Sequence, residues 1–461
     1  MMWRNKWVLL SRVLIVAIVV QAVIVAWGLK PWLAGDSPSY LLLAKNLDAG
    51  FYGEHLANGW APDSLRPPGY PILLWFLLYA LNLPLVCVVV SQVGAYLASL
   101  FLVDRMLETD GLKLAFRLFA AAYPFAAAYS ANIMTESWAM LALSSSAYLL
   151  TRPSLRSSSI LAAGGILGLA SLFRTDLLLL PIGIAFFLGI SFIRSGSSFT
   201  NAIGRASLIL VAAAAMLAPY AIWNLQNFGR LSPAPYAAAV GNSLYTASWQ
   251  ETLELQDFNS FYGGEITPHL ARSGYLEEIT RLNRSIGAPA LTPPDNPIKY
   301  PNLETRIASN KVFGLAALRR IEQQPASYAW HVTKNLWLLW NTSNFPSKVP
   351  AFVVILLLAI SYTVYITGMI GGIVTLVQSR VFERSAIAVV LLLYPFAVHI
   401  PAHLEARYTA AARPLLLMFA AVGTCWIWSR VSTIYLKRIG QGIGTSDTGA
   451  VGAAHQPIQD A

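Results

Sequence analysis

Charged residues lie beside long apolar stretches of this 461-residue chain. A charge in such a place is costly unless water solvates it, an opposite charge pairs with it, or it takes part in binding or catalysis. Asp36 lies seven residues after the first stretch and directly before Ser37-Pro38. Ser37 and Pro38 are typical of a helix start, so the Asp36 carboxylate could cap a helix. It could also accept a proton from a hydroxyl or hold a cation at the membrane surface.

Arg66 begins the segment Arg66-Pro67-Pro68-Gly69-Tyr70-Pro71, which proline makes rigid at the point where the chain returns to apolar sequence. A guanidinium is a planar fork suited to a phosphate group, which membrane lipids offer at their surface. Arg66 is therefore a candidate phosphate ligand. Ordinary anchoring to lipid headgroups is the alternative.

Three further charged motifs occur in comparable places. Thr135-Glu136-Ser137 could cap a helix with an acid that favours its dipole. Arg174-Thr175-Asp176 could be a local ion pair, worth under about 1 kcal/mol if exposed. The third motif is Glu405-Ala406-Arg407-Tyr408.

Two histidines, His399 and His403, precede the last motif and are four residues apart, which would place both on one face of a helix. Pro401 interrupts that helix, so a zinc site has weak support. The cysteines, Cys87 and Cys425, both lie in apolar runs and offer no disulfide framework or CxxC metal site. No HExxH, GxSxG, P-loop or dinucleotide-binding motif appears, so no nucleotide or redox cofactor is expected.

The composition indicates the elements that must position these residues. Hydrophobic residues make up 56% of the chain and charged residues 12%, with a mean hydropathy of +0.55; a soluble domain carries about twice that charge. These values exclude disordered, collagen-like and nucleic-acid-binding classes and indicate a polytopic α-helical membrane protein. We expect ten spans, at 8–29, 84–104, 114–131, 137–151, 159–173, 177–193, 206–224, 350–378, 385–402 and 408–429.

The Lys and Arg residues indicate the orientation. With the N-terminus in the cytoplasm, they gather in the cytoplasmic loops, as the positive-inside rule requires. The short loops opposite then hold only Lys30, Lys45, Arg66, Arg174 and Arg407. The candidate acids fall on this same extracytoplasmic side. The apolar run 69–103 is therefore interpreted as one span plus an interfacial segment, which preserves the alternation.

Four domains are expected. Residues 1–224 form an N-terminal transmembrane module with interfacial helices in a catalytic first loop, and 225–349 form a mostly helical extracytoplasmic region between the seventh and eighth spans. That region mixes nine acids with eleven Lys and Arg, and Leu303–Gln323 and Pro325–Trp340 are predicted amphipathic helices with a loop at Pro289–Pro301 before them. Residues 350–430 form a C-terminal transmembrane module, and 431–461 a disordered cytoplasmic tail.

The charged motifs, in this order and on one side, resemble those of GT-C class integral membrane glycosyltransferases. The resemblance rests on Gly35-Asp36-Ser37-Pro38-Ser39-Tyr40, on Arg66 to Leu74, on Thr135-Glu136, on Leu172-Phe173-Arg174 and on Glu405 to Tyr408. The nearest branch is the superfamily of protein O-mannosyltransferases and lipid A aminoarabinose transferases.

This resemblance implies an enzyme that transfers a sugar, with inversion, from a polyprenyl-phosphate donor to a hydroxyl of a glycan, lipid or protein on the extracytoplasmic face. Asp36 matches the catalytic base and Arg66 a basic residue that binds donor phosphate, with Arg407 a late basic position near the lipid phosphate. Ser37 and Leu65 stand where relatives have acids, so a divalent cation is left open. The supporting acidic or polar residues are Glu136, Arg174, Asp176, Glu405 and Tyr408.

Two other classes remain as alternatives. A transporter or flippase for a lipid-linked sugar should show inverted repeats and polar sites near the bilayer midplane, whereas these charges gather at one face. A non-catalytic partner in an envelope assembly complex would tolerate replacement of Asp36. The expected location is a bacterial inner or plasma membrane, with the active site extracytoplasmic.

Overall fold

Helices make up nearly all of the secondary structure. The computed structural model describes residues 2–443 apart from 31, 34, 57–58, 153, 237–239, 255–256, 258–259, 261–264, 289–301, 340–349, 379–384 and 403–404. Within that part, six segments are long and apolar enough to cross a membrane: 6–28, 85–104, 175–194, 199–228, 351–378 and 407–433. The protein is therefore an integral membrane protein, as predicted.

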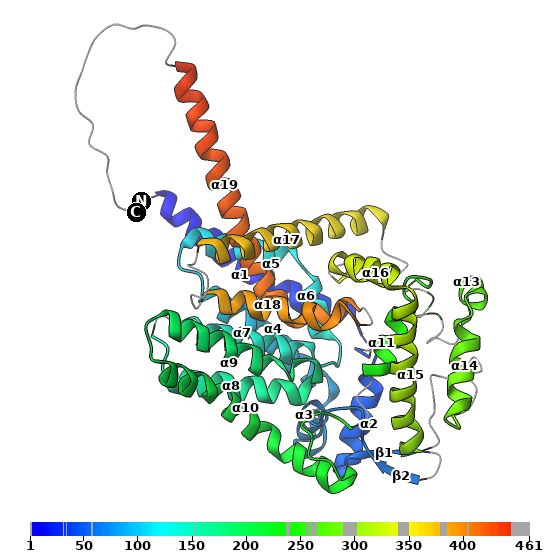
Figure 1. Cartoon of the computed structure of the whole chain (residues 1–461). Coiled ribbons are helices and arrows are strands. Elements are labelled where there is room, and N and C mark those ends of the chain that lie inside the picture. Colours follow the sequence, from blue (N-terminus) through cyan, green and yellow to red (C-terminus); the bar gives the residue numbers. More distant parts are fainter. Residues whose placement is uncertain are drawn as a thin grey trace, which may run out of the picture.

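All ten predicted spans fall on helical structure (Figure 1). The helices concerned are α1 (Met2–Gly28), α4 (Leu85–Asp104), α5 (Asp110–Ala122), α6 (Phe125–Ala131), α7 (Glu136–Leu150), α8 (Ser157–Phe173), α9 (Leu180–Arg194), α10 (Phe199–Phe228), α17 (Ala351–Gln378), α18 (Ser385–His399) and α19 (Arg413–Ile443).

The predicted span at 114–131 is not continuous, because Tyr123 and Pro124 separate α5 from α6. Tyr123 leaves the helical region, with φ −111° and ψ 86°, because the proline that follows disfavours a helical backbone at this residue. The run at 69–103 also divides, here as expected. A short segment, α3 (Gly69–Trp75) with the π-helix Phe76–Ala80, precedes α4, and Pro84 stands between them.

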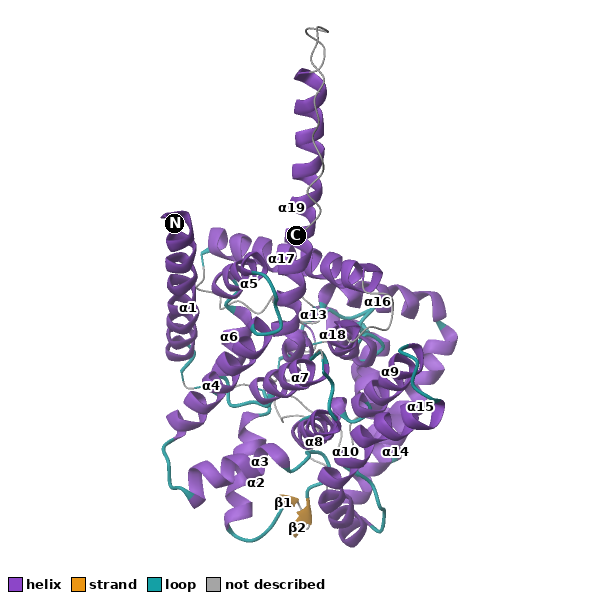
Figure 2. Cartoon of the chain, turned by 90° about the vertical axis from the view of Figure 1, so that its left-hand side faces the viewer, coloured by secondary structure: helices purple, strands orange, loops and turns teal. Residues whose placement is uncertain are grey.

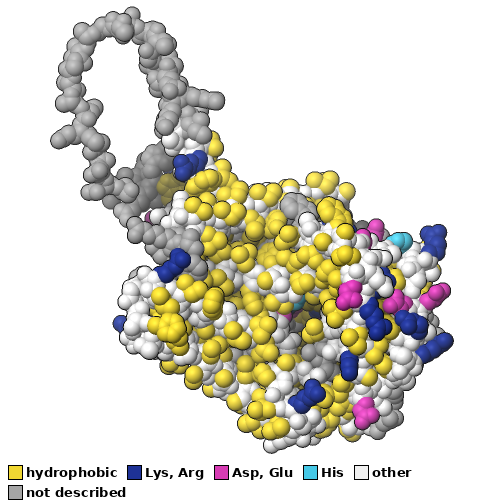
Figure 3. Space-filling model, in the orientation of Figure 1, with side chains coloured by type: hydrophobic (Ala, Val, Ile, Leu, Met, Phe, Trp, Pro, Cys, Tyr) yellow, Lys and Arg dark blue, Asp and Glu magenta, His cyan; other side chains and the backbone are white. Residues whose placement is uncertain are grey.

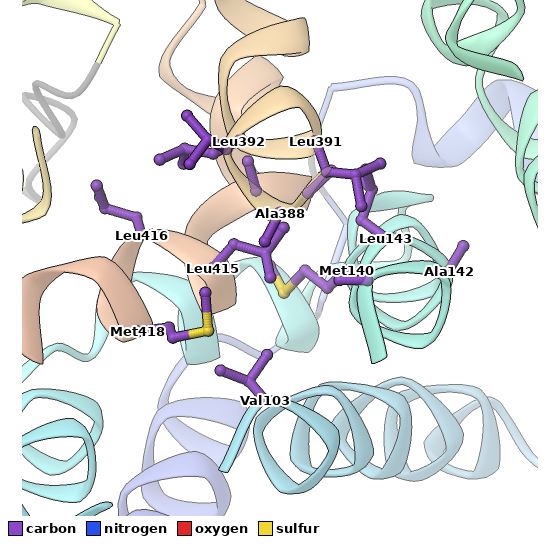
Figure 4. Packing of buried hydrophobic residues seen from close by; sticks show 14 of the residues in the cluster. Val103, Met140, Ala142, Leu143, Ala388, Leu391, Leu392, Leu415, Leu416 and Met418 are labelled. Atoms are coloured by element: carbon purple, nitrogen blue, oxygen red, sulfur yellow. The ribbon is translucent and has the colours of Figure 1, made fainter. Parts of the chain in front are cut away.

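The main core lies where α4, α7, α18 and α19 meet. Val103, Met140, Leu391 and Leu415 are fully buried there, and Figure 4 shows them converging with their neighbours. Small residues let other helices pack backbone to backbone. A Cβ added to Gly371 of α17 would lie 1.9 Å from the carbonyl oxygen of Phe419 in α19, so only glycine fits at that contact.

The first long loop carries two short helices and a hairpin at the end of the molecule far from both the start of α1 and the end of α19 (Figures 1 and 2). Helix α2 covers Ser37–Asp48, and strands β1 (Gly53–Leu56) and β2 (Gly59–Pro62) pair antiparallel, Gly53 opposite Pro62. The hairpin was not predicted, because in strands of four residues the alternation of apolar and polar side chains is too short to recognise.

Among the described residues between α10 and α17 are the helices α11 (Val240–Trp249), α13 (Pro268–Arg272), α14 (Tyr275–Ser285), α15 (Leu303–Gln323) and α16 (Pro325–Leu338). The first four of these share a core of their own. Tyr245, Tyr275 and Phe313 are buried at its centre. Figure 3 shows charged side chains gathered at this edge, while hydrophobic ones cover most of the rest of the face. Helix α15 has the predicted bounds, and the predicted loop Pro289–Pro301 lies outside the described residues.

The C-terminal tail was expected to begin at residue 431, and the structure describes helix beyond that point. Helix α19 continues to Ile443, because no proline follows Pro414 within it and the sequence Ile434-Tyr435-Leu436 keeps apolar residues in the extension. The structure describes no residue beyond 443.

Candidate active site

Asp36 lies between two arginines that come from distant parts of the chain. Its Oδ1 accepts a hydrogen bond from Nη2 of Arg66 at 2.6 Å, and its Oδ2 accepts one from Nη1 of Arg407 at 3.1 Å. Asp36 stands just before α2, Arg66 just before α3, and Arg407 in the 3₁₀ segment η3 (Ala406–Ala412). The fold thus brings together the three residues predicted to carry the chemistry.

The alternative role of Asp36 as a helix cap is not what the structure shows. The residue occupies the N-cap position of α2, yet its side chain makes no capping hydrogen bond. Burial raises the pKa of the Asp36 carboxyl, but Arg66 and Arg407 outweigh burial and hold the pKa below its usual value of 3.8. The group is therefore an ionised carboxylate at neutral pH, with 26% of its side chain exposed.

Arg66 is fixed by its backbone as well as by Asp36. The carboxylate of Asp63 accepts hydrogen bonds from the backbone N–H of Leu65 at 3.0 Å and of Arg66 at 2.6 Å. The Tyr52 hydroxyl donates to the Arg66 carbonyl at 2.8 Å, and the Arg66 guanidinium lies 5.3 Å from the centre of the Tyr40 ring.

Asp63 was not among the predicted site residues. It is 3% exposed, and burial raises its pKa to about 6. The sequence held a signal for this role, since an Asp that precedes a turn commonly hydrogen-bonds backbone N–H groups two and three residues further on.

Arg407 is held from two sides. Glu405 forms an ion pair with it, and the Tyr408 hydroxyl donates to Glu405 at 3.3 Å. Gly35 lies against the guanidinium: its φ is +50°, and an added Cβ would lie 3.2 Å from Nη1 of Arg407. The positive φ favours glycine before Asp36, and any other residue would also require Arg407 to move by a few tenths of an ångström.

Arg174 lies deeper and joins two acids. Its guanidinium donates to Glu136 at 3.2 Å and to Asp176 at 2.8 Å, and the Arg174 and Glu136 side chains are 8% and 2% exposed. The local ion pair considered for Arg174 and Asp176 is present, and helix packing leaves their side chains only 8% and 16% exposed, so the small value for an exposed pair does not apply. The Thr135 side chain makes no capping hydrogen bond to α7. Glu136, in the first turn of α7, forms its ion pair with Arg174.

His399 connects this inner group to the outer one. Its Nε2 lies 2.8 Å from Oδ2 of Asp176, and its ring stacks on Tyr408 with centroids 4.2 Å apart. His403 lies outside the described residues. Within the part of the chain that the structure describes, no three His, Cys, Asp or Glu side chains are placed to hold a metal ion.

Comparison with known proteins adds the fold. No family model and no curated protein sequence matches the chain. The archaeal oligosaccharyltransferase AglB of Archaeoglobus fulgidus is similar in structure, with 12% identity over 96% of this chain and a TM-score of 0.52. The same enzyme in complex with an inhibitory peptide and a dolichol-phosphate is similar over 97% of this chain, with 12% identity and a TM-score of 0.51.

ArnT of Cupriavidus metallidurans bound to undecaprenyl phosphate is 11% identical over 88% of this chain and 76% of its own length, with a TM-score of 0.39. The chain spans about half of the archaeal enzyme, 53% of its length. At 12% identity the comparison shows the fold alone: the chain shares the polytopic α-helical fold of the archaeal oligosaccharyltransferase.

Proposed function

We propose that the protein transfers a sugar from a polyprenyl-phosphate donor to a hydroxyl of an acceptor, with inversion at the sugar carbon. The observation that carries the proposal is the ionised carboxylate of Asp36 between Arg66 and Arg407. The fold shared with AglB, whose structure was also solved with a dolichol-phosphate, supports a lipid-linked donor.

The two arginines would bind the donor phosphate. Each guanidinium has five N–H donors and spends few of them on Asp36, so both can reach a phosphate while they keep that contact. Their charge would stabilise the negative charge that grows on the phosphate as the sugar leaves. Such fixed electrostatic stabilisation is commonly the largest single contribution to catalysis.

Asp36 would act as the general base. The carboxylate takes the proton of the acceptor hydroxyl as that oxygen attacks the sugar carbon from the face opposite the phosphate. Carbon–oxygen bond formation and departure of the polyprenyl phosphate in one displacement invert the carbon. The low pKa of Asp36 keeps the base ionised, and the partial exposure of its side chain leaves it open to an acceptor from water.

Glu405, Tyr408, Glu136, Arg174 and Asp176 would support this site by holding Arg407 and the loops around it. We place the reaction on the extracytoplasmic side of a bacterial inner or plasma membrane, with residues 1–224 and 350–430 as transmembrane modules and 225–349 as the region outside them. A glycan, a lipid or a protein would serve as acceptor.

The deciding experiment uses the purified chain in lipid nanodiscs with radiolabelled polyprenyl-phosphate sugars and membrane extracts as acceptors. Transfer of label to an acceptor, with release of polyprenyl phosphate, supports the proposal. Movement of the intact donor across a proteoliposome membrane without transfer would instead make the protein a flippase. Neither activity with any donor would refute both.

A further inference from the structure

Arg306 joins the helices between α10 and α17 to the loop that carries Arg66. It lies in the first turn of α15, and only 8% of its side chain is exposed. Its guanidinium forms an ion pair with Glu54 of β1 and lies 3.4 Å from the Ser64 hydroxyl. Figure 1 shows this end of α15 beside the β1–β2 hairpin.

The segment that Arg306 touches is the one that orients Arg66. Ser64 is fully buried and follows Asp63, whose carboxylate holds the backbone N–H of Arg66. Arg306 therefore supports this short segment from outside, while Asp63 and Tyr52 support it from within.

Helix α15 is itself firmly attached to its neighbours. Asn310 accepts a hydrogen bond from the backbone N–H of Gly241 at 2.6 Å, and a Cβ added to Gly241 would lie 1.9 Å from the Asn310 carbonyl oxygen. The Phe313 and Tyr245 rings pack edge to face at 4.9 Å. Displacement of α11 would therefore move α15, and Arg306 with it.

We propose that Arg306 is a positioning residue that makes donor-phosphate binding by Arg66 depend on the placement of α15. This inference rests on the proposed function. The Arg306 side chain is 8% exposed and that of Glu54 is 25% exposed. Loss of this partly buried ion pair should let the segment 63–66 shift, so that the Arg66 guanidinium is no longer held in its position. An exposed ion pair would have little such effect.

The test measures binding of polyprenyl phosphate, without a sugar, to the full chain in nanodiscs. Arg306→Ala and Glu54→Gln should each weaken binding by about tenfold. The charge exchange Arg306→Glu with Glu54→Arg should restore it to within about threefold of the parent. Lys311→Ala, an exposed position on the same helix, is the matched control and should bind as the parent does.

Hydrogen exchange at residues 63–68 gives a second readout that does not depend on the lipid. Hydrogen exchange at these residues should be faster in Arg306→Ala than in the parent chain. It should return to the parent rate in the double variant with the two charges swapped, and it should be unchanged in Lys311→Ala. Thermal unfolding of each variant identifies general loss of folding.

The outcomes separate the two proposals. If the parent chain fails to bind polyprenyl phosphate, the proposed function fails, and this inference with it. Two outcomes refute only this inference. In the first, the parent chain binds polyprenyl phosphate and Arg306→Ala binds it equally well. In the second, the double variant with swapped charges restores neither lipid binding nor the parent rate of hydrogen exchange.

Discussion

Asp36 and Arg407 are 371 residues apart in the sequence, yet Oδ2 of Asp36 lies 3.1 Å from Nη1 of Arg407. The contact joins the first loop of the chain to the segment before its last helix. Gly35 leaves room for it, since an added Cβ would lie 3.2 Å from Nη1 of Arg407 and crowd the guanidinium. The base and both phosphate ligands of the proposed reaction therefore depend on correct packing of the two ends of the chain.

Asp36→Asn should abolish proton acceptance while it keeps size and hydrogen bonding. We expect turnover to fall by at least about a hundredfold, with normal insertion and retained binding of polyprenyl phosphate. Asp48→Asn, at the exposed end of α2, is the control. Turnover of Asp36→Asn within a few-fold of the parent would make Asp36 structural and Glu136 the next acid to test.

Arg66 and Arg407 should both contribute to donor affinity. Charge-assisted hydrogen bonds typically contribute about 1.5–3 kcal/mol, so Arg66→Ala and Arg407→Ala should each weaken binding of polyprenyl phosphate by about ten- to a hundredfold. Arg66→Lys should lose less, because the charge remains without the planar fork. Equilibrium binding decides this, with the exposed Lys45→Ala as control. Unchanged affinity in both alanine variants would contradict phosphate binding and favour anchoring to lipid headgroups as the role of these two residues.

Asp63 should make stability depend on pH in a defined direction. Its pKa is raised to about 6 in the folded protein from a usual 3.8, so between these values the folded state binds more protons than the unfolded state. Stability therefore falls as pH rises from about 4 to 6, and the Asp63 contribution is constant above about pH 7. Thermal unfolding of the parent and of Asp63→Asn should differ by an amount that changes across this window. A difference independent of pH would contradict the raised pKa.

Arg174 should be important for stability because it lies between the buried carboxylate of Glu136 and the half-buried carboxylate of Asp176. Arg174→Ala leaves Glu136 and Asp176 without their cation, which typically costs about 3–5 kcal/mol. The melting temperature in detergent should drop clearly. Arg156→Ala, exposed at the start of α8, should change stability by no more than about 0.5 kcal/mol. Equal melting temperatures in the two variants would mean that the inner ion pairs are not important for folding.

The predicted orientation can be tested by labelling in intact cells. After replacement of Cys87 and Cys425, single cysteines at Ser248 and Ser285 should react with an impermeant maleimide, whereas one at Ser379 should not. Ser285 is exposed in the structure and Ser248 half-buried, so Ser285 should label faster. The reverse pattern would place the candidate site in the cytoplasm.

Local sequence was sufficient for most of the helices, and it pointed to the charged side chains that the fold brings together. Apolar length marks a span, and the bounds of α15 follow from Asn302, which caps it at Thr305, and from Pro325 after its end. These signals lie within a few residues of the element they describe.

Pairing and burial could not be read in the same way. Arg174, Thr175 and Asp176 suggested a local ion pair, but nothing near Arg174 in the sequence shows that α7 and α18 will cover its turn. The link from Asp176 through His399 to Tyr408 likewise depends on how α18 and η3 pack. Such contacts arise from the tertiary fold, and the spacing of residues along one helix does not predict them.

The glycine contact between α17 and α19 has a consequence for how lipid reaches the protein. At Gly371 the two backbones touch, and not even a methyl group fits between them. A prenyl chain therefore cannot pass between the two helices at this contact. Under the proposed function, a lipid tail that reaches Arg407 would enter at another place.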